Sequence, residues 1–361
     1  MRWSKSLSLL ILVLLAAASI VLVGGCSKPA PKPLPEQPAV PDNQQLIPSA
    51  PPVRMIIGYF EEPTATAPDK TNSFPSMKTF ARSMTHVAPF RYKITISGTL
   101  EVQDSQLVYD SARQLGLKMF ALITLKNDAA VGILDDPALR TKAIDNIVKV
   151  VVERPFEGVT VSLVGLQPAQ QQNFTAFMAE LYAKLKTQNK TVLVAVPPKI
   201  DVPEKIHGAY NYSGLAKNAD YLQIMLFDRH SPDTEPGAVA PVGWYERNLQ
   251  HAIEQGGGAQ KIIAALNTYG YDWTAGSAKV VKYVDAIVLA QKHGAHIEYD
   301  EQSQAPYFKF LEHEVWYENE KSSAAKLDVI AKYNPAGIAL WQLGQEQPEI
   351  WPLIEQKFPK Q

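Results

Sequence analysis

From residue 54 onward, short apolar runs alternate with amphipathic stretches along the chain. The apolar runs have the length and the branched or aromatic residues of buried strands. The candidate strands are Met55–Tyr59, His86–Phe90, Lys118–Ile123, Gly158–Val164, Thr191–Val196, Tyr221–Met225, Ile262–Leu266 and Gly337–Leu340. Helical spacing of apolar residues lies between most of them, as in Gln106–Gly116 and Phe174–Leu185. Eight strands that alternate with helices predict a (β/α)8 TIM barrel.

An open, doubly wound sheet is the structural alternative to a closed barrel. It is less favoured because no glycine-rich phosphate loop follows the first candidate strand. The three glycines at 256–258 come directly after a helical pattern. They predict the end of that helix and not a phosphate site.

The interval between Leu266 and Gly337 is too long for one crossover helix. It contains a helical pattern at Val280–His293, followed by β-type pieces. These pieces are Ala295–Tyr299, Tyr307–Phe310 and Glu314–Tyr317. We therefore expect a small α+β insertion, at about residues 271–318, between the seventh and the last strand. Because barrel sites lie at the carboxyl ends of strands, such an insertion would wall one side of a groove.

The first 26 residues have the layout of a secretory signal. Arg2 and Lys5 precede an apolar stretch from Leu9 to Val23, and Gly24 and Gly25 lead into Cys26. The segment Leu22-Val23-Gly24-Gly25-Cys26 resembles a bacterial lipobox, in which the cysteine is lipidated. Cys26 is the only cysteine, so it forms no intramolecular disulfide. The alternative is a single-pass membrane helix.

Residues 27–53 contain nine prolines among Lys, Glu, Gln and Ala. Such a segment lacks the backbone donors and the apolar side chains of a folded unit, and it predicts an extended spacer. The expected organisation is a lipoprotein signal peptide at 1–26, a linker at 27–53 and a barrel at 54–361. We expect an extracytoplasmic protein that is bound to the cell membrane through a lipid anchor.

Charge and histidine content exclude several functions. The formal net charge of −1 and the absence of a dense Lys/Arg block argue against a nucleic-acid partner. The seven histidines are scattered, and His293, His296 and His313 in the insertion lack the spacing of zinc ligands. We expect neither a metal nor another cofactor.

Several segments in the right order carry a family resemblance. They are Phe156-Glu157-Gly158-Val159-Thr160-Val161-Ser162-Leu163-Val164, Val194-Ala195-Val196-Pro197-Pro198-Lys199, Tyr221-Leu222-Gln223-Ile224-Met225-Leu226-Phe227-Asp228-Arg229-His230, Tyr269-Gly270-Tyr271-Asp272-Trp273 and Gly337-Ile338-Ala339-Leu340-Trp341-Gln342-Leu343-Gly344. From about Val53 to the C-terminus, the chain resembles glycoside hydrolase family 18, in the branch of chitinases and spore-cortex N-acetylglucosaminidases.

The resemblance implies a motif, D-x-x-D-x-D-x-E, whose last three acidic residues this chain lacks. The motif positions fall on Glu157, Thr160, Ser162 and Val164. In the family the last Glu protonates the glycosidic oxygen, and the preceding Asp orients the 2-acetamido group that attacks the anomeric carbon. Valine has no proton to give, and serine cannot stabilise the developing positive charge. At Phe227 the family usually has a tyrosine that bonds the acetamido oxygen.

Other positions suggest that the groove still binds sugar. Trp341 matches the tryptophan that lies under the sugar in this family, although core packing would also explain it. Asp228 matches a groove aspartate, and its alternative role is to bond a loop or Arg229. Further candidate ligand contacts, at or just beyond strand ends, are Tyr59, Tyr269, Asp272 and Trp273.

Three hypotheses follow. The first is a catalytically inactive, envelope-anchored barrel that binds N-acetylglucosamine-containing glycan of the chitin or peptidoglycan type, or an envelope protein. The second is an active hydrolase in which Asp228 has become the acid. The third is a scaffold for envelope or spore assembly without sugar contact. An open groove lined by Tyr59, Trp273 and Trp341 would favour binding, and a filled one would favour a scaffold.

Overall fold

The computed structural model of the protein describes residues 55–62, 71–89, 92–102, 105–125, 129–275 and 277–359. The predicted signal peptide at 1–26 with Cys26, the predicted linker at 27–53, and Phe90 lie outside the described residues. None of the helices within these ranges combines the length and the apolar character that a membrane span requires.

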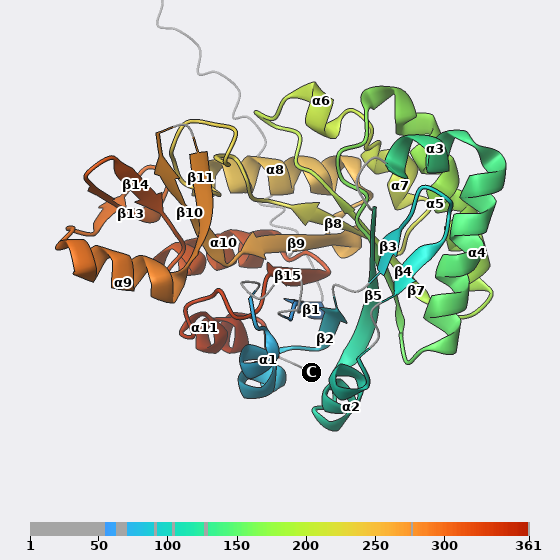
Figure 1. The fold of residues 1–361 in the computed structure, drawn as a ribbon, viewed down its shortest axis with the longest axis horizontal. Coiled ribbons are helices and arrows are strands. Elements are labelled where there is room, and N and C mark those ends of the chain that lie inside the picture. Colours follow the sequence, from blue (N-terminus) through green and yellow to red (C-terminus); the bar gives the residue numbers. More distant parts are fainter. Residues whose placement is uncertain are drawn as a thin grey trace, which may run out of the picture. The chain divides into compact units, whose positions relative to one another are not determined.

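Eight parallel strands close into a barrel in the described part of the chain (Figure 1). They are β1 (Met55–Phe60), β2 (His86–Pro89), β5 (Lys118–Leu125), β6 (Gly158–Val161), β7 (Thr191–Val196), β8 (Tyr221–Met225), β9 (Ile262–Asn267) and β15 (Gly337–Trp341). The barrel closes because β2 pairs with β1 on one side, at Ile57↔His86, and with β5 on the other, at His86↔Lys118. The predicted (β/α)8 barrel is confirmed, and the open-sheet alternative is wrong.

The strands are apolar on both faces because the barrel buries both. Ile57, Leu122 and Leu193 point into the barrel. Their neighbours in the sequence, such as Ile56 and Val194, pack outward under the helices. Alternate residues of a strand point to opposite faces, so this core fixes which side chains of each strand point inward.

Helices and 3-10 turns surround the barrel (Figure 1). The helices are α1 (Phe74–Phe80), α2 (Gln106–Gln114), α3 (Ala129–Asp135), α4 (Pro137–Glu153), α5 (Gln171–Lys186), α6 (Glu204–His207), α7 (Tyr212–Ala216), α8 (Val242–Gln255), α10 (Glu320–Tyr333) and α11 (Ile350–Lys357). The 3-10 turns are η1 (Ala81–Ser83), η2 (Pro168–Gln170) and η3 (Ala259–Lys261). As predicted, α8 ends at the glycine run, where Gly257 and Gly258 have φ of 90° and 97°.

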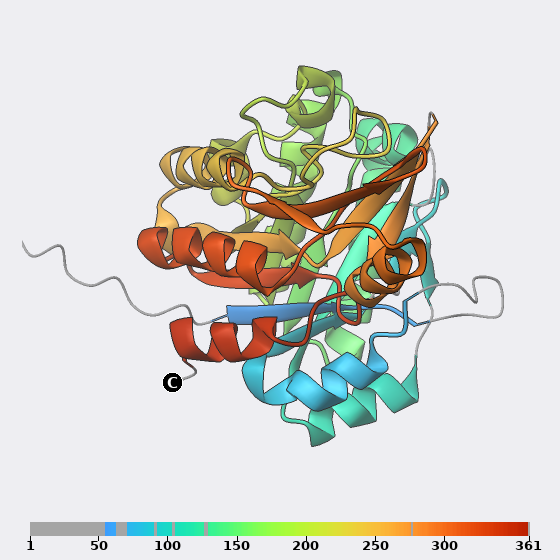
Figure 2. The same cartoon turned by 90° about the vertical axis from the view of Figure 1, so that its left-hand side faces the viewer.

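The insertion is an antiparallel sheet of five strands with one helix. Its strands are β10 (Tyr269–Thr274), β11 (Ser277–Lys282), β12 (Glu298–Asp300), β13 (Ala305–Phe310) and β14 (His313–Trp316), and its helix is α9 (Tyr283–His293). The sheet has the order β11-β10-β14-β13-β12. It follows directly from the carboxyl end of β9, and Figure 2 shows the insertion from its own side.

Two local predictions need correction, and one element was not predicted. The fourth barrel strand ends at Val161 and not at Val164, so Ser162 lies beyond the ladder of β6. Val280 belongs to β11 and not to the following helix, which begins at Tyr283. A hairpin that the sequence did not predict, β3 (Tyr92–Ile94) with β4 (Leu100–Val102), extends the barrel sheet beside β5.

A buried ion pair joins the end of the insertion to α10. The Lys326 ammonium lies 2.6 Å from a Glu318 carboxylate oxygen, and the two side chains are 1% and 4% exposed. The same carboxylate accepts hydrogen bonds from Ser322 and Asn267. Since its oxygens have these partners away from water, removing one partner would leave a charge that nothing nearby compensates.

We predict that Lys326→Met lowers the free energy of unfolding by about 3–5 kcal/mol, because it leaves the Glu318 carboxylate buried and unpaired. Lys184→Met is the matched control, since it breaks the solvent-exposed pair with Asp145 and should cost less than about 1 kcal/mol. Chemical denaturation of the two variants measures the difference. Equal losses in both variants would contradict this assignment.

Candidate functional site

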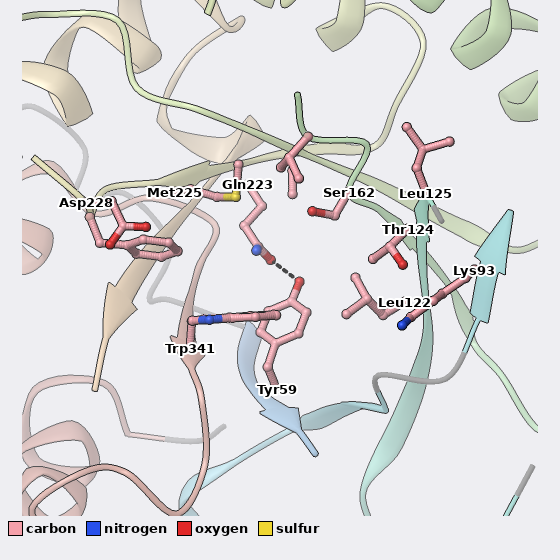
Figure 3. Close-up of a pocket in the computed structure, with 13 residues that line it drawn as sticks. Tyr59, Lys93, Leu122, Thr124, Leu125, Ser162, Gln223, Met225, Asp228 and Trp341 are labelled. Atoms are coloured by element: carbon pink, nitrogen blue, oxygen red, sulfur yellow. Dashed lines mark hydrogen bonds between the residues drawn. The ribbon is translucent and has the colours of Figure 1, made fainter. Parts of the chain in front are cut away.

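A cavity of about 510 Å³ opens at the carboxyl ends of the barrel strands (Figure 3). Its walls come from strands β1, β3, β5, β7, β8 and β15 and from the segments that follow β6 and β8. The lining residues are Tyr59, Lys93, Leu122, Thr124, Leu125, Ser162, Val164, Ala195, Gln223, Met225, Phe227, Asp228 and Trp341. The cavity therefore lies where barrels of this kind place their sites.

Two aromatic side chains form one wall of this cavity. The rings of Tyr59 and Trp341 are 5.1 Å apart between centroids and inclined at 52°. The Tyr59 hydroxyl donates a hydrogen bond of 2.7 Å to Gln223, which comes from the inner face of β8 (Figure 3). Burial raises the pKa of Tyr59 to about 12, despite this hydrogen bond. Tyr59 is therefore a neutral, fixed group near neutral pH.

The positions that correspond to the family motif separate into two groups. Ser162 and Val164 line the cavity, although both follow the end of β6, and Val164 is 57% exposed. Thr160, which lies on β6 two residues before Ser162, is fully buried. Glu157 lies at the opposite, amino end of β6, where it pairs with Lys118 at 2.9 Å and lies 3.8 Å from His86. No carboxylate of this strand reaches the cavity.

Asp228 and Phe227 come from the segment after β8. Phe227 lines the cavity and contacts Tyr269 edge to face, at 6.2 Å between centroids. Asp228 has a φ of +61°, and one carboxylate oxygen accepts hydrogen bonds from Tyr269 at 2.5 Å and Tyr271 at 3.0 Å. Burial of the carboxylate raises its pKa, and the two tyrosines act against this rise. The residue as a whole stays exposed at the rim.

The predicted ligand contacts on β10 lie beside the cavity and not in its wall. Tyr269 and Trp273 form an aromatic cluster with Tyr271 and Val239. Asp272 points to the other face of the sheet, where its carboxylate lies 2.8 Å from His313 Nδ1. Of the six predicted contacts, Tyr59, Asp228 and Trp341 line the cavity. Ligand contact itself stays a prediction for all six.

Sequence reasoning missed several polar groups in or next to the cavity, among them Gln223, Tyr271 and Lys93. Gln223 occupies an inward position of β8, and the alternation along that strand would have revealed it. Tyr271 shares a face of β10 with Tyr269 and Trp273. Lys93 points its ammonium into the cavity (Figure 3), but it lies on β3, which the apolar pattern did not predict. Within the described ranges, no three His, Cys, Asp or Glu side chains are arranged to hold a metal ion.

Fold and cavity define a (β/α)8 barrel with an aromatic-walled cavity of the size of a small-ligand site. A match to the family described as Glycosyl hydrolases family 18 covers residues 56–346. The chain therefore belongs to glycoside hydrolase family 18.

Individual relatives agree with this assignment. The chain is 31% identical over 221 residues to the Bacillus subtilis protein YdhD, which is named as a sporulation-specific glycosylase. This match covers 58% of the chain and 52% of YdhD, so the chain spans about half the length of that relative.

Solved structures extend the comparison. The Bacillus cereus spore cortex-lytic enzyme SleL has a TM-score of 0.76 and 25% identity, and the match covers 85% of this chain and 75% of SleL. A chitinase from Chromobacterium violaceum has the same TM-score and identity, with 85% of this chain and all of the chitinase covered.

We predict a pH-dependent effect of Asp228→Asn on stability. Because burial raises the pKa of Asp228 above 3.8, the folded state holds its proton more tightly than the unfolded chain does. Its contribution to stability is full below 3.8 and falls as the pH rises through the raised value. The melting temperature of Asp228→Asn, relative to the unmutated protein, should therefore rise across that window and then level off.

Asparagine suits this test because it tolerates a positive φ and can still accept a hydrogen bond. Asp201→Asn is the matched backbone control, since Asp201 has a φ of 56° and its side chain is 52% exposed. A flat difference for Asp228→Asn, or an equal rise in the control, would contradict the inferred burial.

Proposed function

We propose that this family-18 barrel binds N-acetylglucosamine-containing glycan, of the chitin or peptidoglycan type, without hydrolysing it. The observation that carries the proposal is the presence of Ser162 and Val164 in a cavity that is open and keeps an aromatic wall. An indole and a phenol ring supply apolar surface for the C–H face of a pyranose. The volume of about 510 Å³ suits a small-ligand site.

The chemistry of the cavity supports the absence of hydrolysis. General acid catalysis contributes about 10²- to 10⁴-fold to such reactions, and Val164 has no proton to donate. Stabilisation of developing charge is commonly as large an effect, and the Ser162 hydroxyl carries no charge for it. Tyr59 does not replace the acid, because its pKa is about 12 and its proton is directed to Gln223.

Three comparisons support a glycan as the ligand. The relatives are named as a glycosylase, a spore cortex-lytic enzyme and a chitinase. Their names imply cleavage, so the proposal departs from them in the chemistry and not in the class of ligand. The open cavity argues against a pure scaffold, although Trp273 lies outside its wall.

For the location of the protein, we propose that Cys26 carries a lipid anchor at the extracytoplasmic face of the membrane. The proline-rich residues 27–53 would then hold the barrel away from the bilayer. An envelope glycan would lie within reach of a barrel held in this way.

A second function rests on Asp228. It is the carboxyl group among the cavity-lining residues, and its pKa is raised, as a general acid requires. Its two tyrosine donors favour the ionised form, which makes it a better hydrogen-bond acceptor than acid. With this second function, the protein would be a hydrolase that loses its activity in Asp228→Asn.

We predict that Trp341→Ala weakens the binding of chitohexaose at least about tenfold, because it removes the larger ring of the aromatic wall. Isothermal titration measures the affinity. Tyr333→Ala, an aromatic truncation on α10 away from the cavity-lining residues, should bind as the unmutated protein does. A protein that binds no chitohexaose, or a Trp341→Ala variant that binds it equally well, would refute glycan binding in this cavity.

We also predict that Ser162→Asp/Val164→Glu gains hydrolysis of a chromogenic N-acetylglucosaminide, by at least about 10²-fold over the unmutated protein. The two carboxyl groups would stand at the missing family positions. Ser162→Asn/Val164→Gln is the matched control, with similar shapes and no acid. Turnover by the unmutated protein would overturn the proposal, and its loss in Asp228→Asn would establish the second function.

A further inference from the structure

Three hydrogen-bond donors stand side by side on one side of the barrel cavity. Lys93 of β3 and Thr124 of β5 are direct partners in the parallel pairing of these strands. The amide of Ser162 donates to the Ile123 carbonyl at 2.8 Å, which continues the β5–β6 pairing by one residue and places Ser162 beside Thr124. All three side chains line the cavity. We call Lys93, Thr124 and Ser162 the donor row.

The strand that carries Lys93 is held in place on the barrel. Its neighbours Tyr92 and Ile94 are buried in the core under the helices. Because alternate residues of a strand point to opposite faces, Lys93 points inward. Asn146 of α4 donates a hydrogen bond of 2.8 Å to the Gly98 carbonyl in the turn of the hairpin. Figure 3 shows the Lys93 ammonium directed into the cavity, so its charge stands at a defined place in the wall.

The groups of the donor row can turn to a ligand. The Thr124 hydroxyl donates to the Tyr92 carbonyl at 3.4 Å, which is longer than the about 2.5–3.0 Å of a usual hydroxyl hydrogen bond. In the described part of the chain, the Ser162 hydroxyl has no hydrogen-bond partner. Glu101, the cross-strand neighbour of Lys93 in the hairpin, does not line the cavity. An ammonium has three N–H donors, so Lys93 can contact a protein group and a ligand together.

The charge of Lys93 lies apart from that of Asp228. Among the lining residues, Lys93 is the basic one and Asp228 the acidic one. Asp228 follows β8, and strands β7 and β6 separate β8 from β5. Its carboxylate accepts hydrogen bonds from Tyr269 and Tyr271, and Figure 3 shows it across the cavity from Lys93. An anionic group of a ligand can therefore lie beside Lys93 without meeting Asp228.

The donor row also faces the aromatic wall. The closed ring of strands has the order β15-β1-β2-β5-β6-β7-β8-β9, so β15 and β6 lie across the barrel from each other. Trp341 is the last residue of β15, and Ser162 follows the end of β6. A sugar ring that packs against Trp341 therefore has the donor row on its other side.

An ammonium beside two hydroxyls suits an anion with several acceptor oxygens. A hydrogen bond between charged groups is roughly twice as strong as a neutral one, so a carboxylate gains more from Lys93 than a hydroxyl or an N-acetyl oxygen does. Chitin carries only hydroxyl and N-acetyl groups. The N-acetylmuramic acid of peptidoglycan carries a lactyl ether that ends in a carboxylate.

We propose that the donor row binds the free lactyl carboxylate of an N-acetylmuramic acid unit, with the Lys93 ammonium as the main contact. This inference rests on the proposed glycan binding in the cavity, and it selects peptidoglycan over chitin. A stem peptide turns the lactyl carboxylate into a neutral amide. The preferred unit is therefore one from which the peptide has been removed, and Lys93 determines this specificity.

The test compares three tetrasaccharides by isothermal titration of the full-length protein in detergent. They are chitotetraose, a peptide-free tetrasaccharide of alternating N-acetylglucosamine and N-acetylmuramic acid, and the same tetrasaccharide with its carboxylates converted to primary amides. The amide form keeps the lactyl group and removes only its charge. The unmutated protein should bind the acid form about fivefold more tightly than the amide form, and added salt should reduce this preference.

Variants assign the preference to one side chain. Lys93→Met keeps an unbranched stem without the ammonium and should abolish the preference, whereas Lys93→Arg keeps the charge and should retain it. Lys149→Met is the matched control, since it removes the same charge at an exposed site of α4 outside the cavity, and it should retain the preference in full. Glu101→Gln should increase the preference, because it removes the carboxylate that stands across the hairpin from Lys93. The preference is a ratio within one protein, so a general loss of affinity does not imitate it.

The outcomes distinguish the two proposals. If chitotetraose binds and depends on Trp341 but the acid form binds no more tightly than the amide form, the role of Lys93 is refuted and the cavity proposal stands. If none of the three tetrasaccharides binds, both proposals are refuted. A preference that persists in Lys93→Met would place the carboxylate elsewhere and overturn the inference.

Discussion

Closure of the barrel by the pairing of β2 with β5 is the constraint on which the site depends. A closed ring of parallel strands turns one face of every strand toward a common axis, and it brings all carboxyl ends to one mouth. Tyr59, Gln223 and Trp341 are far apart in the sequence, and they meet because each occupies an inward position near that mouth. Without closure, β1 and β8 would not face each other, and the hydrogen bond from Tyr59 to Gln223 would not form.

In this arrangement the fold does not depend on the positions that correspond to the family motif. The strands are stabilised by apolar cores on both faces of the barrel sheet, with residues such as Ile57 and Val194. The carboxylates of the family motif are not part of these cores. Replacing them with Thr160, Ser162 and Val164 removes like charges from a confined space, so the change costs the fold little. The fold is therefore compatible with the neutral side chains at these positions.

Much of the architecture could be predicted from sequence because apolar periodicity reports burial. It identified the barrel strands, the insertion and the glycine-run end of α8. Apolar periodicity gave a wrong or missing prediction where another interaction determines the conformation. Val280 fits a helical pattern, yet cross-strand pairing with Tyr271 holds it in β11. The short hairpin that carries Lys93 has too few residues to show a period. Apolar periodicity also does not predict which side chains pair. The Asp272 carboxylate, for example, points away from the cavity to His313.

The charges around the mouth of the barrel separate in the same way as the fold and the motif. Among the positions that correspond to the family motif, Thr160, Ser162 and Val164 carry no charge. Glu157 is acidic, but it pairs with Lys118 at the amino end of β6, away from the mouth. A carboxylate at the position of Ser162 or Val164 would act on a bond placed in the cavity, whereas one at the far end of the strand does not reach it. On the proposed function, a glycan in the cavity meets the rings of Tyr59 and Trp341 and no proton donor at Val164. A protein that recognises a glycan without consuming it requires the loss of that donor, because a retained acid would cleave the ligand that the aromatic rings hold.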